Sequence, residues 1–160
     1  MIAIKFWSTG DEGISPDGRA EDEINILSRL STSDSDERAS MIPRVFGLLD
    51  VDGRQGLIIS RVPNSLPLGM KPIDSIKMLR CRYNLKDFSW TLPFITQVVV
   101  DIATALKHCH SRFISHGDVY AHNILIDKVS GRAYLTDFGA AFMYSKNEAE
   151  VMQLFCDSVK

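Results

Sequence analysis

Cysteine is scarce in this chain, which has three cysteines in 160 residues. Cys81, Cys109 and Cys156 are odd in number and none forms a C-x-x-C pair, so the sequence predicts no disulfide framework. Cys109 lies between His108 and His110, but no partner pair of ligands has the spacing of a zinc motif. Reduced thiols in or near a core are therefore expected.

Long apolar runs and an excess of one charge are also missing. No run approaches the roughly 18 residues of a membrane span, and the apolar start at residues 1–7 is too short for a signal peptide. Lys and Arg number 18 and Asp and Glu 20, which gives a net charge of −2. No electrostatic attraction to nucleic acid or to a membrane surface is therefore expected. The sequence favours a soluble cytoplasmic protein with neither of those partners.

The 160 residues, 45% of them hydrophobic, are enough for one domain with its own core. In the helix expected near the N-terminus, one side carries Ile24, Ile26, Leu27 and Leu30. Asp52-Gly53 is typical of a tight hairpin turn between two strands. The N-terminal part predicts a strand, a loop, a helix, a polar break and two strands, in that order: residues 1–7, 8–18, 19–30, 31–40, 44–50 and 55–62.

The rest of the chain is expected to be richer in helix. An extended connection marked by Pro63, Pro67 and Gly69 comes first. After it the pattern predicts a short helix, a long helix, two strands around a turn, and a last helix: residues 72–80, 92–113, 123–127, 133–136 with the turn at 128–132, and 147–159. The long helix is expected to direct one stripe toward the core: Ile95, Val99, Ile102, Ala103 and Leu106.

Two polar motifs flank the predicted pair of strands. His116-Gly117-Asp118 precedes Asn123, and Asp137-Phe138-Gly139 begins fourteen residues after Asn123. A hairpin between them would bring Asn123 and Asp137 to the same end of neighbouring strands. Phosphoryl transfer needs a carboxylate that orients and deprotonates the attacking hydroxyl, and hard oxygen ligands for magnesium. Asp118 suits the first task, and Asn123 with Asp137 suits the second.

These motifs resemble the catalytic loop and the Asp-Phe-Gly triplet of the protein kinase family. By this resemblance Asp118 matches the catalytic Asp of H-R-D-L-x-x-x-N, Asn123 matches its Asn, and Asp137 matches the metal-binding Asp. The resemblance implies that Asn123 and Asp137 hold Mg²⁺ while Asp118 accepts the proton of the attacking hydroxyl. His116 and Phe138 are interpreted as packing and positioning residues under the metal site.

The start of the chain resembles a second kinase motif. Ala3-Ile4-Lys5 is similar to the V-A-I-K strand, which implies that Lys5 binds the α- and β-phosphates of ATP. Glu23 is expected to be its partner on the first helix, with Glu21 as the alternative. The resemblance also implies an adenine site of two sandwiching side chains and two hydrogen-bonding backbones: Ala3 and Leu125, and Ser60 and Val62. ATP and Mg²⁺ are thus the expected cofactor and metal.

The order of elements fits the kinase fold from its third strand onward. The resemblance implies an α+β, kinase-like two-lobe fold in partial form, one partial domain over residues 1–160. Residues 1–62 would be a small antiparallel N-terminal lobe without its first strands and its glycine loop. Residues 63–160 would be the hinge and the start of a helical C-terminal lobe, without the Ala-Pro-Glu motif.

Two residues depart from the kinase pattern. Gly117 stands where H-R-D has the Arg that docks a phosphorylated activation loop, and Tyr120 stands where serine/threonine kinases carry Lys. A phenol supplies no positive charge at neutral pH. These departures leave open a pseudokinase-like binding module or an inactive fragment. His-Gly-Asp also occurs in phosphotransferases resembling aminoglycoside kinases, so a small-molecule acceptor is a further alternative.

The intact Asp137-Phe138-Gly139 favours a protein kinase, similar to divergent kinase domains found with leucine-rich repeats. The expected activity is transfer of the ATP γ-phosphoryl group to a protein hydroxyl, Ser or Thr ahead of Tyr.

Overall fold

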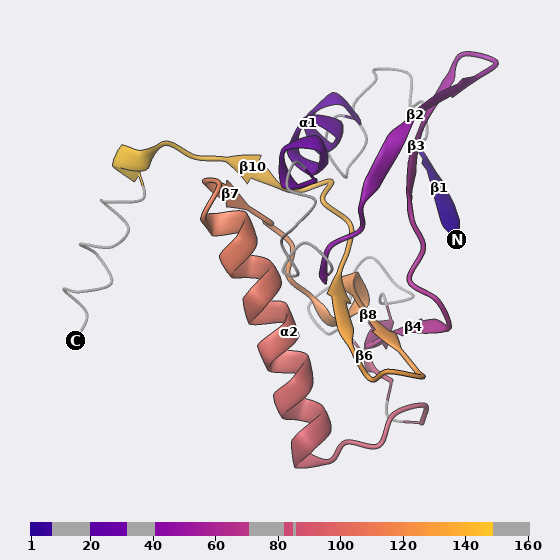
Figure 1. Ribbon diagram of the computed structural model, residues 1–160, viewed down its shortest axis with the longest axis vertical. Helices are drawn as coiled ribbons and strands as arrows, with labels where there is room; N and C mark the ends of the chain where they lie inside the picture. The colour runs from indigo at the N-terminus through magenta and orange to yellow at the C-terminus, as the bar shows by residue number, and fades with distance from the viewer. Residues whose placement is uncertain (8–19, 32–40, 71–81, 85, 149–160) are drawn as a thin grey trace.

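The computed structural model describes residues 1–7, 20–31, 41–70, 82–84 and 86–148 (Figure 1). Several sequence predictions lie outside these residues: the loop at 8–18, all but the first residue of the break at 31–40, the helix at 72–80, and residues 149–159 of the last helix. Cys81 and Cys156 lie outside them as well. The remaining predicted elements can be compared directly with the structure.

A three-stranded antiparallel sheet forms the N-terminal part. Its strands are β1 (Ile2–Phe6), β2 (Val45–Val51) and β3 (Arg54–Ser60), in the order β1-β3-β2. Asp52 and Gly53 connect β2 to β3 with φ angles of 54° and 77°, as a two-residue hairpin turn with two positive φ angles requires. The predicted strands and their turn are confirmed.

Helix α1 (Ala20–Leu30) lies beside this sheet and is the predicted amphipathic helix (Figure 1). Ile26, Leu27 and Leu30 are buried, and Ile24 packs partly against the same core. The buried ring of His108 contacts the Leu30 carbonyl through Nε2 at 3.1 Å. The last turn of α1 is thereby attached to the rest of the core.

Helix α2 (Leu92–His110) is the longest element (Figure 1). The Thr91 side chain caps its start by accepting from the Phe94 N–H. The helix ends three residues before the predicted boundary at Phe113. Phe113 has a φ of 55°, which is incompatible with a right-handed helix.

The stripe predicted for α2 was mostly wrong. Ile95 and Val99 are 41% and 61% exposed and Ala103 is also exposed, whereas Ile102 is buried and Leu106 half-buried. The buried stripe comprises Val98, Ile102, Ala105 and Cys109. Both stripes have helical spacing, and the contacts of α2 with β7 (Ile114–Ser115) and β9 (Ala133–Leu135) decide which one is buried. Burial raises the pKa of the Cys109 thiol to about 11, in agreement with the reduced core thiol expected there.

Short strands and a 3-10 helix make up much of the remaining described chain. Strand β8 (Ile124–Asp127) pairs with β9 (Ala133–Leu135) in the predicted hairpin and with β4 (Ser65–Pro67) on its other side. The 3-10 helix η3 (Ala121–Asn123) precedes β8. Two small pairs are also antiparallel: β5 (Gly69–Met70) with β6 (Arg82–Tyr83), and β7 (Ile114–Ser115) with β10 (Phe142–Met143).

Buried Asp101 attaches the β8–β9 hairpin to α2. Its carboxylate accepts from Arg132 Nε at 3.0 and 3.1 Å and from the Ala133 N–H at 2.9 Å. Gln97 donates to the same carboxylate at 2.9 Å. The start of β9 is thus held at a fixed position along α2.

Small antiparallel sheets and helices make this an α+β fold, as predicted. Within the described part of the chain, no helix is long and apolar enough to cross a membrane.

Candidate active site

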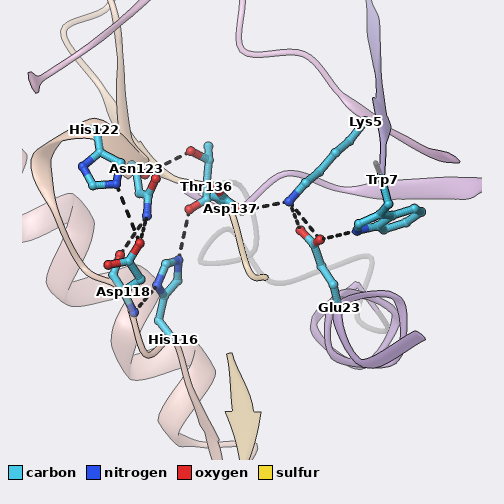
Figure 2. A network of polar contacts seen from close by, with 9 residues as sticks. All are labelled: Lys5, Trp7, Glu23, His116, Asp118, His122, Asn123, Thr136 and Asp137. Carbon is cyan, nitrogen blue, oxygen red and sulfur yellow. Dashed lines mark hydrogen bonds and ion pairs between the residues drawn. The ribbon is translucent and has the colours of Figure 1, made fainter. Parts of the chain in front are cut away.

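A lysine from the first strand joins two carboxylates that lie far from it in the sequence (Figure 2). Lys5 Nζ donates to Glu23 Oε1 and Oε2 at 2.8 and 2.9 Å, and to Asp137 Oδ1 at 2.8 Å. Glu23 comes from α1, and Asp137 lies two residues after β9 ends. Glu21, the alternative partner, is exposed and lines a surface pocket instead.

The pairing with two carboxylates decides the charge of Lys5. Burial by itself lowers the pKa of this ammonium, but the hydrogen bonds to Asp137 and Glu23 outweigh burial and raise the pKa above its ordinary value. The Glu23 carboxylate is almost completely buried, and Trp7 Nε1 also donates to it at 3.1 Å. Lys5 is therefore a fixed positive charge at the edge of the site.

Asp137 occupies a sharp bend after β9. Its φ of 62° is left-handed and unusual for a residue with a side chain. Phe138 is 1% exposed, and its ring lies 4.6 Å from the His116 ring at an angle of 62°. His116 Nε2 donates to the Thr136 carbonyl at 3.0 Å, while its Nδ1 accepts from the Asp118 N–H at 3.3 Å. His116 and Phe138 thus pack and position the two loops.

The second group of polar residues centres on Asp118 and Asn123. Asn123 Nδ2 donates to the Asp118 carbonyl at 2.9 Å and to Asp118 Oδ2 at 2.8 Å. Asn123 is buried, and its main-chain carbonyl accepts from both the N–H and the hydroxyl of Thr136. The Asn123 amide is therefore oriented with its nitrogen toward Asp118.

Two further rings lie beside Asp118. His122 Nε2 is 3.7 Å from Asp118 Oδ2, and the rings of His122 and Tyr120 stack at 5.8 Å with an interplanar angle of 11°. Asp118 itself is partly exposed, so its carboxylate is accessible from solvent. The Asp118 carboxylate thus combines a hydrogen bond from Asn123 with a side that is open to solvent.

Comparison with known proteins assigns the chain to a family. The sequence pattern described as "Protein kinase domain" matches residues 75–159, which is just over half of the chain. This chain belongs to the protein kinase domain family.

Three relatives are kinases by name, and the names of the first two include serine/threonine. Fowlpox virus "Probable serine/threonine-protein kinase FPV212" is 40% identical over 58 residues, or 36% of this chain and 19% of that protein. Serine/threonine-protein kinase csk1 of Schizosaccharomyces pombe is 36% identical over 58 residues, with the same shares covered. Casein kinase II subunit alpha' of Saccharomyces cerevisiae is 29% identical over 122 residues, or 76% of this chain and 30% of that protein. The chain thus spans less than a third of the length of these kinases.

The side-chain oxygen atoms of Asn123 and Asp137 fit magnesium. Among the described residues, no group of three or more His, Cys, Asp or Glu could hold a metal ion by itself. Asn123 and Asp137 offer amide and carboxylate oxygens, the hard ligands that Mg²⁺ prefers. Mg²⁺ usually takes only one or two protein ligands and completes its shell with phosphate and water. Two protein oxygen ligands are therefore sufficient for a Mg²⁺ ion whose shell is completed by phosphate and water.

The residues expected around adenine lie on separate elements. Half-buried Ala3 pairs with Ile59 between β1 and β3, whereas half-buried Leu125 is on β8. The Ser60 N–H donates to the Arg44 carbonyl at 2.8 Å, and Val62 is buried just beyond β3. The structure therefore gives the positions of these four residues, and the adenine site stays a prediction.

Trp7 and Thr136 belong to the polar network but were missed from the sequence. Trp7 is two residues after Lys5, and strand alternation directs both to the same face, so its position was a usable signal. Thr136 acts mainly through its backbone, which bonds His116 and Asn123. Almost any residue type can make such backbone hydrogen bonds, so the sequence does not reveal them.

Proposed function

We propose that this chain forms part of a protein kinase domain that transfers the γ-phosphoryl group of ATP to a serine or threonine hydroxyl of a protein. The observation that carries the proposal is the contact of Lys5 with both Glu23 and Asp137. Three motifs far apart in the sequence converge there with the charges that a metal–triphosphate site needs. The names of the relatives support a protein hydroxyl as the acceptor.

Each polar residue has a separate task in this proposal. Lys5 binds the α- and β-phosphates, and Glu23 holds its ammonium in place. Asn123 and Asp137 hold Mg²⁺, which neutralises the triphosphate when bound. Asp118 orients the acceptor hydroxyl and takes its proton, because its carboxylate is fixed by Asn123 and open to solvent.

The nucleotide base belongs beside β3 and β8. Ala3 and Leu125 sandwich the adenine ring, and the backbones of Ser60 and Val62 hydrogen-bond its edge. In this arrangement residues 1–62 contribute the N-terminal lobe, and residues 63–160 the hinge and the start of the C-terminal lobe. The proposed site therefore lies between the N-terminal sheet and the β8–β9 hairpin. A cytoplasmic location, with its supply of ATP, is part of this proposal.

A nucleotide-binding module without turnover is the second candidate. Tyr120 favours it, because this residue stands where serine/threonine kinases carry Lys and its ring is 56% exposed beside Asp118. The neutral phenol cannot stabilise a transferring phosphate as an ammonium does. A small-molecule phosphotransferase is less well supported, since two of the relatives are serine/threonine-protein kinases by name.

Phosphate transfer to a protein separates these candidates. The chain is incubated with Mg²⁺, γ-labelled ATP and dephosphorylated casein, and label is sought on serine and threonine. The proposal expects label that falls by about 100-fold or more in Asp118→Asn. Binding of ATP with no transfer to protein or to the chain itself would favour the module without turnover.

A further inference from the structure

Gly117 lies between His116 and Asp118 with a φ of 76°, in the left-handed region that favours glycine. A Cβ built on Gly117 would overlap the carbonyl oxygen of Ala140 and would lie 3.0 Å from its carbonyl carbon. Backbone atoms cannot move aside as a flexible side chain can. The two backbones therefore meet where no side chain fits, and we call this the Gly117–Ala140 contact.

The contact joins two loops that both carry proposed site residues. Gly117 directly precedes Asp118, and Ala140 comes three residues after Asp137. On one side of the contact, His116 bonds the Thr136 carbonyl and packs against Phe138. On the other, the Ala141 N–H donates to the Phe138 carbonyl at 3.0 Å, closing a turn around Ala140. Neighbouring contacts on each side of Gly117 and Ala140 thus hold the two loops together.

Gly117 also departs from the kinase pattern, which has Arg at this place. An arginine here would need a Cβ at a left-handed φ and against the Ala140 carbonyl. Gly117 offers no cation to a phosphorylated residue in the following segment. The Ala140 carbonyl group occupies the space where the Cβ of an arginine would lie.

We propose that Gly117 is a positioning residue whose lack of a side chain lets the Ala140 carbonyl close on the catalytic loop. The Gly117–Ala140 contact fixes Asp137 relative to Asp118 and does so without a phosphorylated residue. Its effect on nucleotide binding rests on the proposed function, whereas the contact itself does not. Restoring the arginine of the family pattern is therefore expected to damage the site.

Gly131 provides a matched control. Its φ of 70° is close to that of Gly117, but a Cβ there has nothing within 4 Å. Gly131→Ala introduces the backbone strain alone, whereas Gly117→Ala adds the overlap with Ala140. We expect Gly117→Ala and Gly117→Arg to weaken calorimetric binding of Mg·ATP by about tenfold or more, and Gly131→Ala by no more than about twofold. Equal binding by all three variants would overturn the proposal.

Amide hydrogen exchange tests the contact without any nucleotide. In the unphosphorylated, unsubstituted chain, the Ala141 amide should be protected to about the degree of the Thr136 amide, which bonds to Asn123. Gly117→Ala should remove protection at Ala141 and keep it at Thr136. Exchange of Ala141 at the rate of an unstructured amide in the unsubstituted chain would overturn the proposal, even if Gly117→Ala failed to fold. Absence of Mg·ATP binding by the unsubstituted chain would instead count against the proposed function.

Discussion

The Lys5 ammonium donates to the Asp137 carboxylate at 2.8 Å, although 132 positions separate the two residues. Lys5 is held by pairing of β1 with β3, and Asp137 by the end of the β8–β9 hairpin. Their ion pair therefore links the N-terminal sheet to the loops that carry Asp118 and Asn123. In the proposed nucleotide complex, the Lys5 ammonium binds phosphate and the Asp137 carboxylate binds Mg²⁺.

Replacement of Lys5 tests the energetic part of this link. Lys5→Met leaves the buried Glu23 carboxylate without the Lys5 cation, while Trp7 Nε1 still donates to it at 3.1 Å. Loss of one partner of such a pair is expected to lower the free energy of unfolding by about 2–4 kcal/mol. Urea denaturation measures the change.

The control for this prediction is Lys86→Ala, at an exposed lysine. It should change stability by less than about 0.5 kcal/mol. Adding Glu23→Gln to Lys5→Met should recover part of the loss, because an amide carries no buried charge. If Lys5→Met were as stable as Lys86→Ala, the ion pair would not contribute as the structure indicates.

Asp101 should be the main polar determinant of the hairpin's position. Asp101→Asn replaces a buried carboxylate that accepts from Arg132 and from the Ala133 N–H. An amide cannot accept all of these bonds, so a loss of about 2–4 kcal/mol is expected. Asp87→Asn, at an exposed position, is the control. Equal urea midpoints for the two variants would show that the Asp101 contacts contribute little.

Much of the site followed from sequence because its motifs lie at the ends of locally determined elements. The Asp52-Gly53 turn and the hairpin between Asn123 and Asp137 are set by turn residues and strand alternation, which act over a few positions. The position of Lys5 opposite Glu23 depended instead on family resemblance. Composition alone gave no reason for these two residues to meet.

The face of α2 could not be predicted, because its apolar residues cover more than one side. Ile95 and Val99 fit helical spacing as well as Val98 and Ile102 do, and only contact with the hairpin selects the second pair. The Gly117–Ala140 contact was hidden for a similar reason. A positive φ and a close backbone approach depend on where another loop lies.

Asn123 is expected to support metal binding and orient Asp118 together. Asn123→Ala removes both hydrogen bonds to Asp118 and one of the two proposed Mg²⁺ ligands. Calorimetry should find that Mg²⁺ improves ATP affinity by about tenfold less than in the unsubstituted chain, while metal-free ATP binding changes little. Asn84→Ala, outside the site, should retain the full metal effect. Unchanged Mg²⁺ dependence in Asn123→Ala would remove this residue from the metal site.

Stability should fall as the pH falls below 6.5, in part because of His116. Burial lowers the pKa of this imidazole from its ordinary value of 6.5, and Nδ1 already accepts from the Asp118 N–H. The unfolded chain therefore binds the proton more readily, so acid favours unfolding through this residue. Melting temperatures at pH 7.5 and 5.5 measure the effect.

His116→Gln should lose less melting temperature than the unsubstituted chain between these two pH values. His110→Gln removes an exposed imidazole and should leave the pH dependence unchanged. If the melting temperature of His116→Gln fell between these pH values as much as that of His110→Gln, groups other than His116 would cause the acid sensitivity.

Calorimetric titration with ATP, with and without Mg²⁺, tests the central claim most directly. The account predicts that Mg²⁺ strengthens ATP binding to the unsubstituted chain, and that Asp137→Asn loses this gain because an amide is a weaker Mg²⁺ ligand than a carboxylate. Absence of binding at millimolar ATP, or a Mg²⁺ effect that persists in Asp137→Asn, would contradict a kinase nucleotide site built on Lys5, Asn123 and Asp137.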